Sequence, residues 1–158
     1  VGVGLMTIVG QCLGAGRKDE AIYYIKKLCV IAEIVIIVSC LTVYALARPV
    51  TILGGMEKSS AAMCIHMITW ITIVKPLVWT MAFVPGYGLR AAGDVKFTMF
   101  VSIASTLLGR VVFSIIFAIY LNLGVIGIAF AMCLDWTIRA VIFYCRYRSE
   151  KWLEFKVI

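Results

Sequence analysis

The sequence predicts an all-α membrane protein, a polytopic bundle of transmembrane helices, and three observations lead to this class. First, 63% of the 158 residues are hydrophobic and only 15% are charged, whereas soluble domains average roughly 45–50% and 25%. Second, the apolar residues form runs long enough to cross a bilayer. Third, the basic residues gather in alternate connections between these runs. A soluble domain with this composition would expose large apolar patches, which soluble monomers avoid.

The first two elements are an incomplete helix and a full span. Residues 1–15 are apolar and glycine-rich, and a glycine followed by a charged turn, Gly16-Arg17-Lys18, is typical of a helix end. Because the chain opens at Val1 inside this apolar run, we expect it to be a fragment. A second helix is expected over 28–47, since 20 apolar residues at ~1.5 Å each cover the ~30 Å hydrocarbon core. We expect Arg48-Pro49 to end it.

A third helix is predicted over 61–89, with Pro76 and Pro85 in its interior. Each proline lacks an N–H and clashes with the carbonyl four residues earlier, at Thr72 and Met81 respectively. The sequence therefore predicts kinks, and it predicts backbone acceptors inside the membrane that need other partners.

The last two spans are expected over 97–121 and 125–145, joined by a tight turn and followed by a basic, aromatic tail over 146–158. Membrane β-strands are ~10 residues long and alternate in polarity, and these runs do neither. The sequence thus predicts four full spans and one partial span.

Orientation follows from arginine and lysine, because basic residues concentrate in cytoplasmic loops. Ten basic residues flank the first and third connections and the tail, and two flank the second connection. The ten are Arg17, Lys18, Lys26, Lys27, Arg90, Lys96, Arg146, Arg148, Lys151 and Lys156, and the two are Arg48 and Lys58. We therefore expect a cytoplasmic C-terminus and an external loop around Glu57.

Several other function classes lack a sequence signal. The basic residues form no patch interleaved with aromatics, so nucleic-acid binding is not indicated. The six cysteines show no C-x-x-C spacing, so neither a disulfide framework nor a metal site is predicted. The chain has one histidine and no G-x-S-x-G or H-E-x-x-H motif, so we expect a protein that is not an enzyme.

Ionisable residues inside the predicted spans are the candidates for function, because each costs at least ~2.5 kcal/mol near the bilayer centre. They are Glu33, His66, Lys75, Arg110, Asp135 and Arg139. Asp135 and Arg139 are four residues apart on one helix, so we interpret them as a structural ion pair in preference to transport groups. Arg110 is interpreted as a brace between helices, and His66 as an interfacial residue.

Lys75 and Glu33 are the candidates for a substrate or ion pathway. Lys75 directly precedes Pro76 near mid-membrane, where a helix break exposes carbonyls and admits water. Glu33 lies too deep in its span for a short side chain to reach the interface, which suits a proton-linked or cation-linked role. The alternative is structural: Lys75 pairs with Glu33 or with an acid elsewhere, and Glu33 pairs with a neighbouring basic residue.

Small residues predict close helix approach at three places. These are Gly10-x-x-x-Gly14, the stripe Ser102, Ser105 and Gly109, and Gly127-x-x-x-Ala131.

Three segments resemble motifs of the multidrug and toxic compound extrusion (MATE) family. They are Val9-Gly10-Gln11-Cys12-Leu13-Gly14-Ala15-Gly16 with Asp19-Glu20-Ala21, then Gly88-Leu89-Arg90-Ala91-Ala92-Gly93-Asp94-Val95-Lys96-Phe97-Thr98, and finally Gly124-Val125-Ile126-Gly127 with Asp135-Trp136-Thr137-Ile138-Arg139-Ala140. They resemble the end of the family's eighth helix, its turn between helices ten and eleven, and its last helix, in family order and spacing.

The resemblance implies a fold and a function. Residues 1–158 would be part of the C-terminal lobe, from late helix eight to helix twelve, of a transporter with two six-helix lobes in the cell membrane. Such transporters exchange Na⁺ or H⁺ for organic cations, so the implied partners are the bilayer, small organic cations and the N-terminal lobe, with no cofactor beyond the coupling ion. Related flippases of lipid-linked precursors and a non-transporting membrane scaffold are the alternatives.

Overall fold

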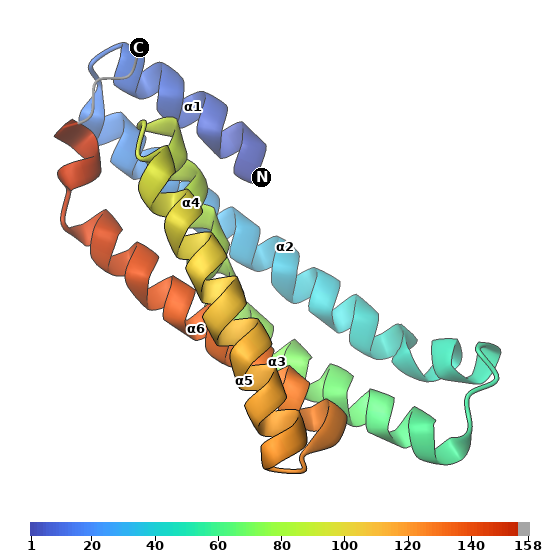
Figure 1. Ribbon diagram of the computed structural model, residues 1–158. Coiled ribbons are helices and arrows are strands. Elements are labelled where there is room, and N and C mark those ends of the chain that lie inside the picture. The colour runs from blue at the N-terminus through green and yellow to red at the C-terminus, as the bar shows by residue number, and fades with distance from the viewer. Residues whose placement is uncertain (155–158) are drawn as a thin grey trace.

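The computed structural model describes residues 1–154, and their regular structure is entirely helical (Figure 1). The elements are α1 (Gly2–Gly14), α2 (Lys18–Leu53), α3 (Lys58–Ala91), α4 (Val95–Ala104), η1 (Ser105–Val112), α5 (Phe113–Ile115), η2 (Ile116–Tyr120), α6 (Gly124–Arg148) and η3 (Lys151–Glu154). The segments from α4 to η2 follow one another without a break and form one long helix over 95–120, of which η1 and η2 are π-helical. The predicted all-α class is confirmed.

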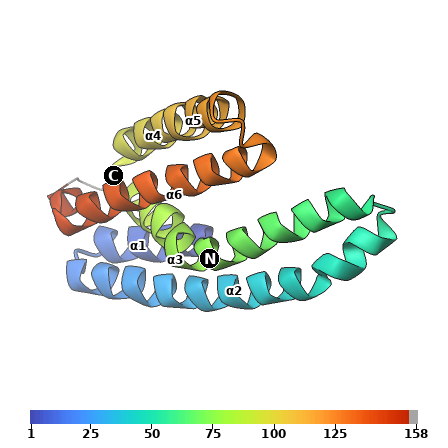
Figure 2. The ribbon, with the colours of Figure 1, turned by 90° about the horizontal axis from the view of Figure 1, so that it is seen from below.

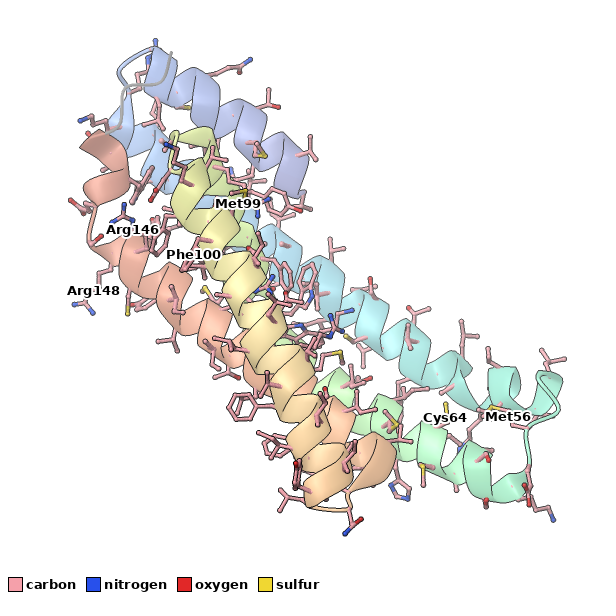
Figure 3. All side chains as sticks on the ribbon, in the orientation of Figure 1. Met56, Cys64, Met99, Phe100, Arg146 and Arg148 are labelled. Carbon is pink, nitrogen blue, oxygen red and sulfur yellow. The ribbon has the colours of Figure 1, made fainter. Side chains whose placement is uncertain are left out.

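Four helices are long and apolar enough to cross a membrane: α2, α3, the helix over 95–120, and α6. The helix α1 is apolar but has only 13 residues. Large apolar side chains cover the outside of the bundle; Phe100 is 73% exposed and projects from α4 beside Met99 (Figure 3). Exposure of this apolar surface to water would be unfavourable, whereas its contact with lipid is favourable. The chain is therefore a multi-pass membrane protein.

The helix α3 is the centre of the bundle, because α1, α2 and α6 all pack against it. It lies between α2 and α6 (Figure 2). On its far side, α6 carries the helix over 95–120, which packs on α6 along most of its length. Side chains on α3 and α6 therefore make most of the contacts between helices in this bundle.

The helix α2 corrects the prediction that Arg48-Pro49 ends the second span, since it continues through Pro49 to Leu53. A proline removes only its own bond to the carbonyl four residues earlier, and the helix can complete one more turn, bent off its axis as Figure 2 shows. It stops before Gly55, whose φ of 62° few other residues adopt. At the other end, α2 begins at Lys18, ten residues before the apolar run over 28–47.

The helix α3 also runs without interruption past Pro76 and Pro85. Its axis changes direction between its two ends (Figure 2), as a helix does when a proline removes a bond on one side.

Two connections and the last helical segment lie at one end of the bundle: the α1–α2 turn, the α3–α4 turn and η3 (Figure 1). Gly93 has a φ of 95° and closes the α3–α4 turn, which allows the backbone N–H of Asp94 to reach the Leu89 carbonyl at 3.0 Å. The carboxylate of Asp94 then accepts a bond from Arg146 Nε at 2.7 Å, and the Arg146 guanidinium lies 4.8 Å from the Phe97 ring centroid. These contacts tie the end of α6 to the start of α4.

This end also carries the basic residues that predict the cytoplasmic side, among which Lys156 lies outside the described residues. The α2–α3 connection lies at the opposite end (Figure 1). We expect a cysteine introduced by Glu57→Cys, in a background without the native cysteines, to react with a membrane-impermeant maleimide in intact cells. A control cysteine from Asp19→Cys should react only after permeabilisation, and the reverse pattern would contradict the assignment.

Close helix approach occurs at two of the three predicted places. A Cβ on Gly127 would lie 2.7 Å from the Phe117 carbonyl carbon, and a Cβ on Gly109 would lie 3.2 Å from Asp135 Cα. The prediction is wrong for Gly10 and Gly14 within the described structure, because no atom lies within 4 Å of a Cβ there. The helix α1 packs through Leu5 and Val9, which lie on another face.

The contact at Gly127 predicts a stability difference between two glycine variants. Gly127→Ala should lower the free energy of unfolding by about 1–3 kcal/mol, because a methyl group would be forced against the backbone of the neighbouring helix. Gly10→Ala is the matched control and should change stability little. Melting of the two purified variants in detergent compares them, and equal melting temperatures would show that the approach at Gly127 is not tight.

Candidate functional site

Asp135 and Arg139 lie at the centre of a buried polar layer between α6 and η1. Both are nearly inaccessible, with 1% and 7% of their surface exposed, and Arg139 Nη2 lies 3.3 Å from Asp135 Oδ1. The hydroxyl of Ser105 donates a hydrogen bond to the same Asp135 oxygen. Arg139 Nη2 donates to Thr106 Oγ1 at 2.9 Å and to the Ser102 carbonyl at 3.4 Å. The two buried charges thus compensate each other, and their hydrogen-bonding groups find partners within the bundle.

This layer continues onto α3 through aromatic rings at a spacing of four residues. The Arg139 guanidinium lies 4.9 Å from the centroid of the Phe83 ring, and Phe83 stacks on Trp79 with centroids 4.7 Å apart. Lys75 is the next residue in the series, and its Nζ lies 5.7 Å from the Trp79 centroid. One face of α3 therefore joins the lysine to the buried ion pair through two rings.

Glu33 lies on a different surface, in a groove with a volume of about 560 Å³. The helix α3 forms the floor of this groove, and α2 and α6 form its walls. The lining residues are Ile25, Lys26, Cys29, Val30, Glu33, Pro76, Leu77, Thr80, Met81, Pro85, Tyr144 and Tyr147. Most of the lining is apolar, and the single carboxylate is that of Glu33. A concave, mainly apolar site with a few polar groups is typical of small-molecule binding.

Two hydroxyl groups of this groove are buried without a hydrogen-bond partner in the described structure: Thr80 Oγ1 and Tyr147 OH. They are the buried, unpaired side-chain polar atoms found among the described residues, and both line the groove. The floor also contains Pro76 and Pro85, and the proline ring at 85 leaves the Met81 carbonyl without its helical partner. The lining of the groove thus includes a carboxylate that belongs to no ion pair among the described residues and two hydroxyls without internal hydrogen bonds.

The structure separates Lys75 from Glu33, two residues that the sequence left as a possible pair. Pro76 shares the groove with Glu33, whereas Lys75 contacts Trp79 on the adjacent face, because consecutive helical residues point ~100° apart. The ion pairs among the described residues are Arg17–Glu20, Asp135–Arg139 and Asp94–Arg146. Neither Lys75 nor Glu33 belongs to one of these ion pairs. Compensation of either charge would have to come from water, a substrate, an ion or another part of the protein.

The other two intramembrane candidates lie away from both sites. His66 lines an apolar cavity of about 370 Å³ between α3 and α6, together with Trp70 and Phe130. Arg110 lies in the exposed part of η1 and donates to the Met132 sulfur at 2.9 Å. No group of three or more possible metal ligands occurs within the described residues.

Sequence reasoning missed the partners that complete these sites. Ser105 is 30 residues from Asp135, and Thr80 is far from Glu33 in the chain, so no local spacing joins them. One signal was present: the stripe Ser102, Ser105 and Gly109 was interpreted as packing, and it also supplies the hydroxyl and the carbonyl that solvate the ion pair. Gly109 lets Asp135 approach.

Comparison with known proteins identifies related sequences. A family model described as MatE matches residues 1–116. A curated relative, the "Uncharacterized transporter YisQ" of Bacillus subtilis (strain 168), is 33% identical over 66 residues. This match covers 42% of the present chain and 14% of the relative, so the chain corresponds to a small part of that protein. No solved structure matches.

Proposed function

Because the chain belongs to the MatE family, we propose that it is part of a secondary transporter that exports organic cations in exchange for Na⁺ or H⁺. The observation that supports coupling to an ion is the carboxylate of Glu33, which belongs to no ion pair among the described residues. It lies in the groove whose floor is the proline-containing part of α3. The printed name of the relative, a transporter, supports the general activity.

The physical argument for Glu33 is the cost of its charge. A carboxylate in the hydrocarbon region without a basic partner costs at least ~2.5 kcal/mol, and binding a cation or a proton removes this cost. Thr80 and Met81 line the same groove, and oxygen atoms are the ligands that hard cations prefer. Transporters place such sites where irregular backbone lines a cavity. Loading and unloading Glu33 would then favour different conformations, which couples an ion gradient to transport.

Efflux by the full-length protein tests the transport activity. Energised cells that express it should extrude ethidium faster than control cells, and collapse of the Na⁺ or H⁺ gradient should abolish the difference. If the full-length protein moves no cationic dye but flips a labelled lipid-linked sugar, the flippase alternative replaces this proposal.

Glu33→Gln tests the coupling role, because the amide has nearly the same shape but neither binds a proton nor carries a charge. We expect about a tenfold decrease in gradient-driven efflux, with protein abundance unchanged. Glu57→Gln, in the loop before α3, is the matched control and should leave efflux unchanged. Efflux by the Glu33 variant equal to that of the control would assign coupling to another residue.

A further inference from the structure

The groove that contains Glu33 opens at the basic end of the bundle into a second cavity of about 300 Å³. The two cavities share Lys26, Tyr144 and Tyr147. We call this second cavity the groove mouth; its remaining lining residues are Ile22, Arg148, Glu150 and Trp152. The helices α2 and α6 pack mainly on α3 and not on each other, and both contribute residues to the groove and to its mouth.

The groove mouth lies at the level where lipid headgroups lie. Lys26 is two residues before the apolar run that begins at Leu28, and Arg148 is the last residue of α6. Aromatic residues mark this level in membrane proteins, and here Tyr147 and Trp152 stack with ring centroids 5.7 Å apart. Trp152 Nε1 also donates to the Tyr147 carbonyl at 3.0 Å. The aromatic wall of the mouth is therefore held in place.

The charges of the groove mouth favour an anion. Lys26 and Arg148 are exposed, and neither belongs to an ion pair among the described residues. Figure 3 shows Arg148 extending outward from the end of α6. Glu150 is the acidic residue of the lining, so two cations face one carboxylate and the net charge is positive. The neighbouring Lys27 is engaged elsewhere, with its Nζ 5.6 Å from the Tyr23 ring centroid.

The interior of the groove is suited to a hydrocarbon chain that continues from this anion. Ile25, Val30, Leu77 and Met81 line it, and Leu77 is 75% exposed. Glu33 lies seven residues beyond Lys26, roughly 10 Å deeper along α2 at ~1.5 Å per residue. Its carboxylate repels an anion at that depth. A molecule with a negative head and an apolar tail therefore fits in one direction only, head at the mouth and tail inward.

We propose that the groove mouth binds an anionic phospholipid of the adjacent leaflet, with its phosphate between Lys26 and Arg148 and one acyl chain in the groove. Basic pockets between transmembrane helices bind phosphate headgroups in this way. Tyr147, whose buried hydroxyl has no hydrogen-bond partner among the described residues, lines both the groove and its mouth. The acyl chain would share the groove with Glu33, but lipid binding does not rest on the proposed transport activity and is measured without it.

Binding of fluorescent phosphatidylglycerol to the purified full-length protein in detergent tests this site. The double variant Lys26→Gln/Arg148→Gln should bind it at least tenfold more weakly, and Lys27→Gln, one residue away but outside the mouth, should bind within twofold of the unmodified protein. Lys26→Arg should retain binding because it keeps the charge. Leu77→Trp, which fills the groove, should also weaken binding.

The other arms separate a lipid site from alternatives. Phosphatidylcholine should bind at least tenfold more weakly than phosphatidylglycerol, and inorganic phosphate should not compete at millimolar concentration. Equal affinity for both lipids, competition by free phosphate, or equal loss of binding in Lys27→Gln would overturn the proposal.

Discussion

Asp135→Ala is expected to lower the free energy of unfolding by about 3–5 kcal/mol, because it leaves the buried Arg139 guanidinium without its counter-charge. The structure explains the size of this effect. Arg139 is 7% exposed and cannot reach water without disturbing α6. Its remaining contacts are all uncharged: the Ser105 and Thr106 hydroxyls, the Ser102 carbonyl and the Phe83 ring. Reversible unfolding of the purified full-length protein in mixed detergent micelles, followed by tryptophan fluorescence, measures the change.

The matched control for this prediction removes both charges. Asp135→Asn/Arg139→Gln should regain a large part of the lost stability, because neutral polar side chains of similar size carry no uncompensated charge. Ser105→Ala should cost about 1 kcal/mol, the typical net value of one hydrogen bond. If the double variant is as unstable as Asp135→Ala, packing and not charge compensation accounts for the loss.

Lys75→Met should reduce coupled efflux by about tenfold or more while protein abundance stays near normal. The reason is a comparison of magnitudes. A lysine near the bilayer centre costs at least ~2.5 kcal/mol, and a contact such as the one with the Trp79 ring returns about 0.5–2 kcal/mol. The contact therefore does not offset the charge, so the lysine is a poor choice for stability alone. We therefore propose a transport role for Lys75.

The measurement must separate this role from a structural one. Efflux and the amount of folded protein should be determined on the same membranes, for Lys75→Met and for Lys58→Met, a control lysine at the start of α3. A structural lysine would show less folded protein with unchanged efflux per molecule. That outcome, or normal specific efflux by the Lys75 variant, would refute the transport role.

The sequence predicted the helices well and their ends less well. Apolar runs report the hydrocarbon region, so the existence of each span followed directly from composition. The true start of α2 at Lys18 did not, because a helix that continues into water carries charged residues and resembles a loop in hydropathy. The prediction that the helix ends at Pro49 is wrong because a proline removes a single backbone hydrogen bond, and one further turn after it costs little.

A similar distinction applies to the candidate sites: a contact within one helix could be predicted from the sequence, whereas contacts between helices could not. The spacing of four residues placed Asp135 beside Arg139, and the structure shows the ion pair; its structural role stays a prediction. Whether Lys75 meets Glu33 depends on the rotation of α3 against α2, which no pattern within either helix determines. The mouth formed by Lys26 and Arg148 joins the two ends of the chain, and only the packed bundle brings them together.

The π-helical turns of η1 and η2 have a consequence for the evolution and engineering of the helix over 95–120. A wide turn is the form that one surplus residue takes inside an α-helix, so the segment from Ser105 to Val112 holds more chain than an α-helix of equal length needs. Deleting one residue there would restore α-helical turns and leave the half that begins at Phe113 near its present angular phase, whereas deleting one residue from an α-helical stretch turns everything beyond it by ~100°. The wide turns thus absorb a surplus residue without rotating the half of the helix that begins at Phe113.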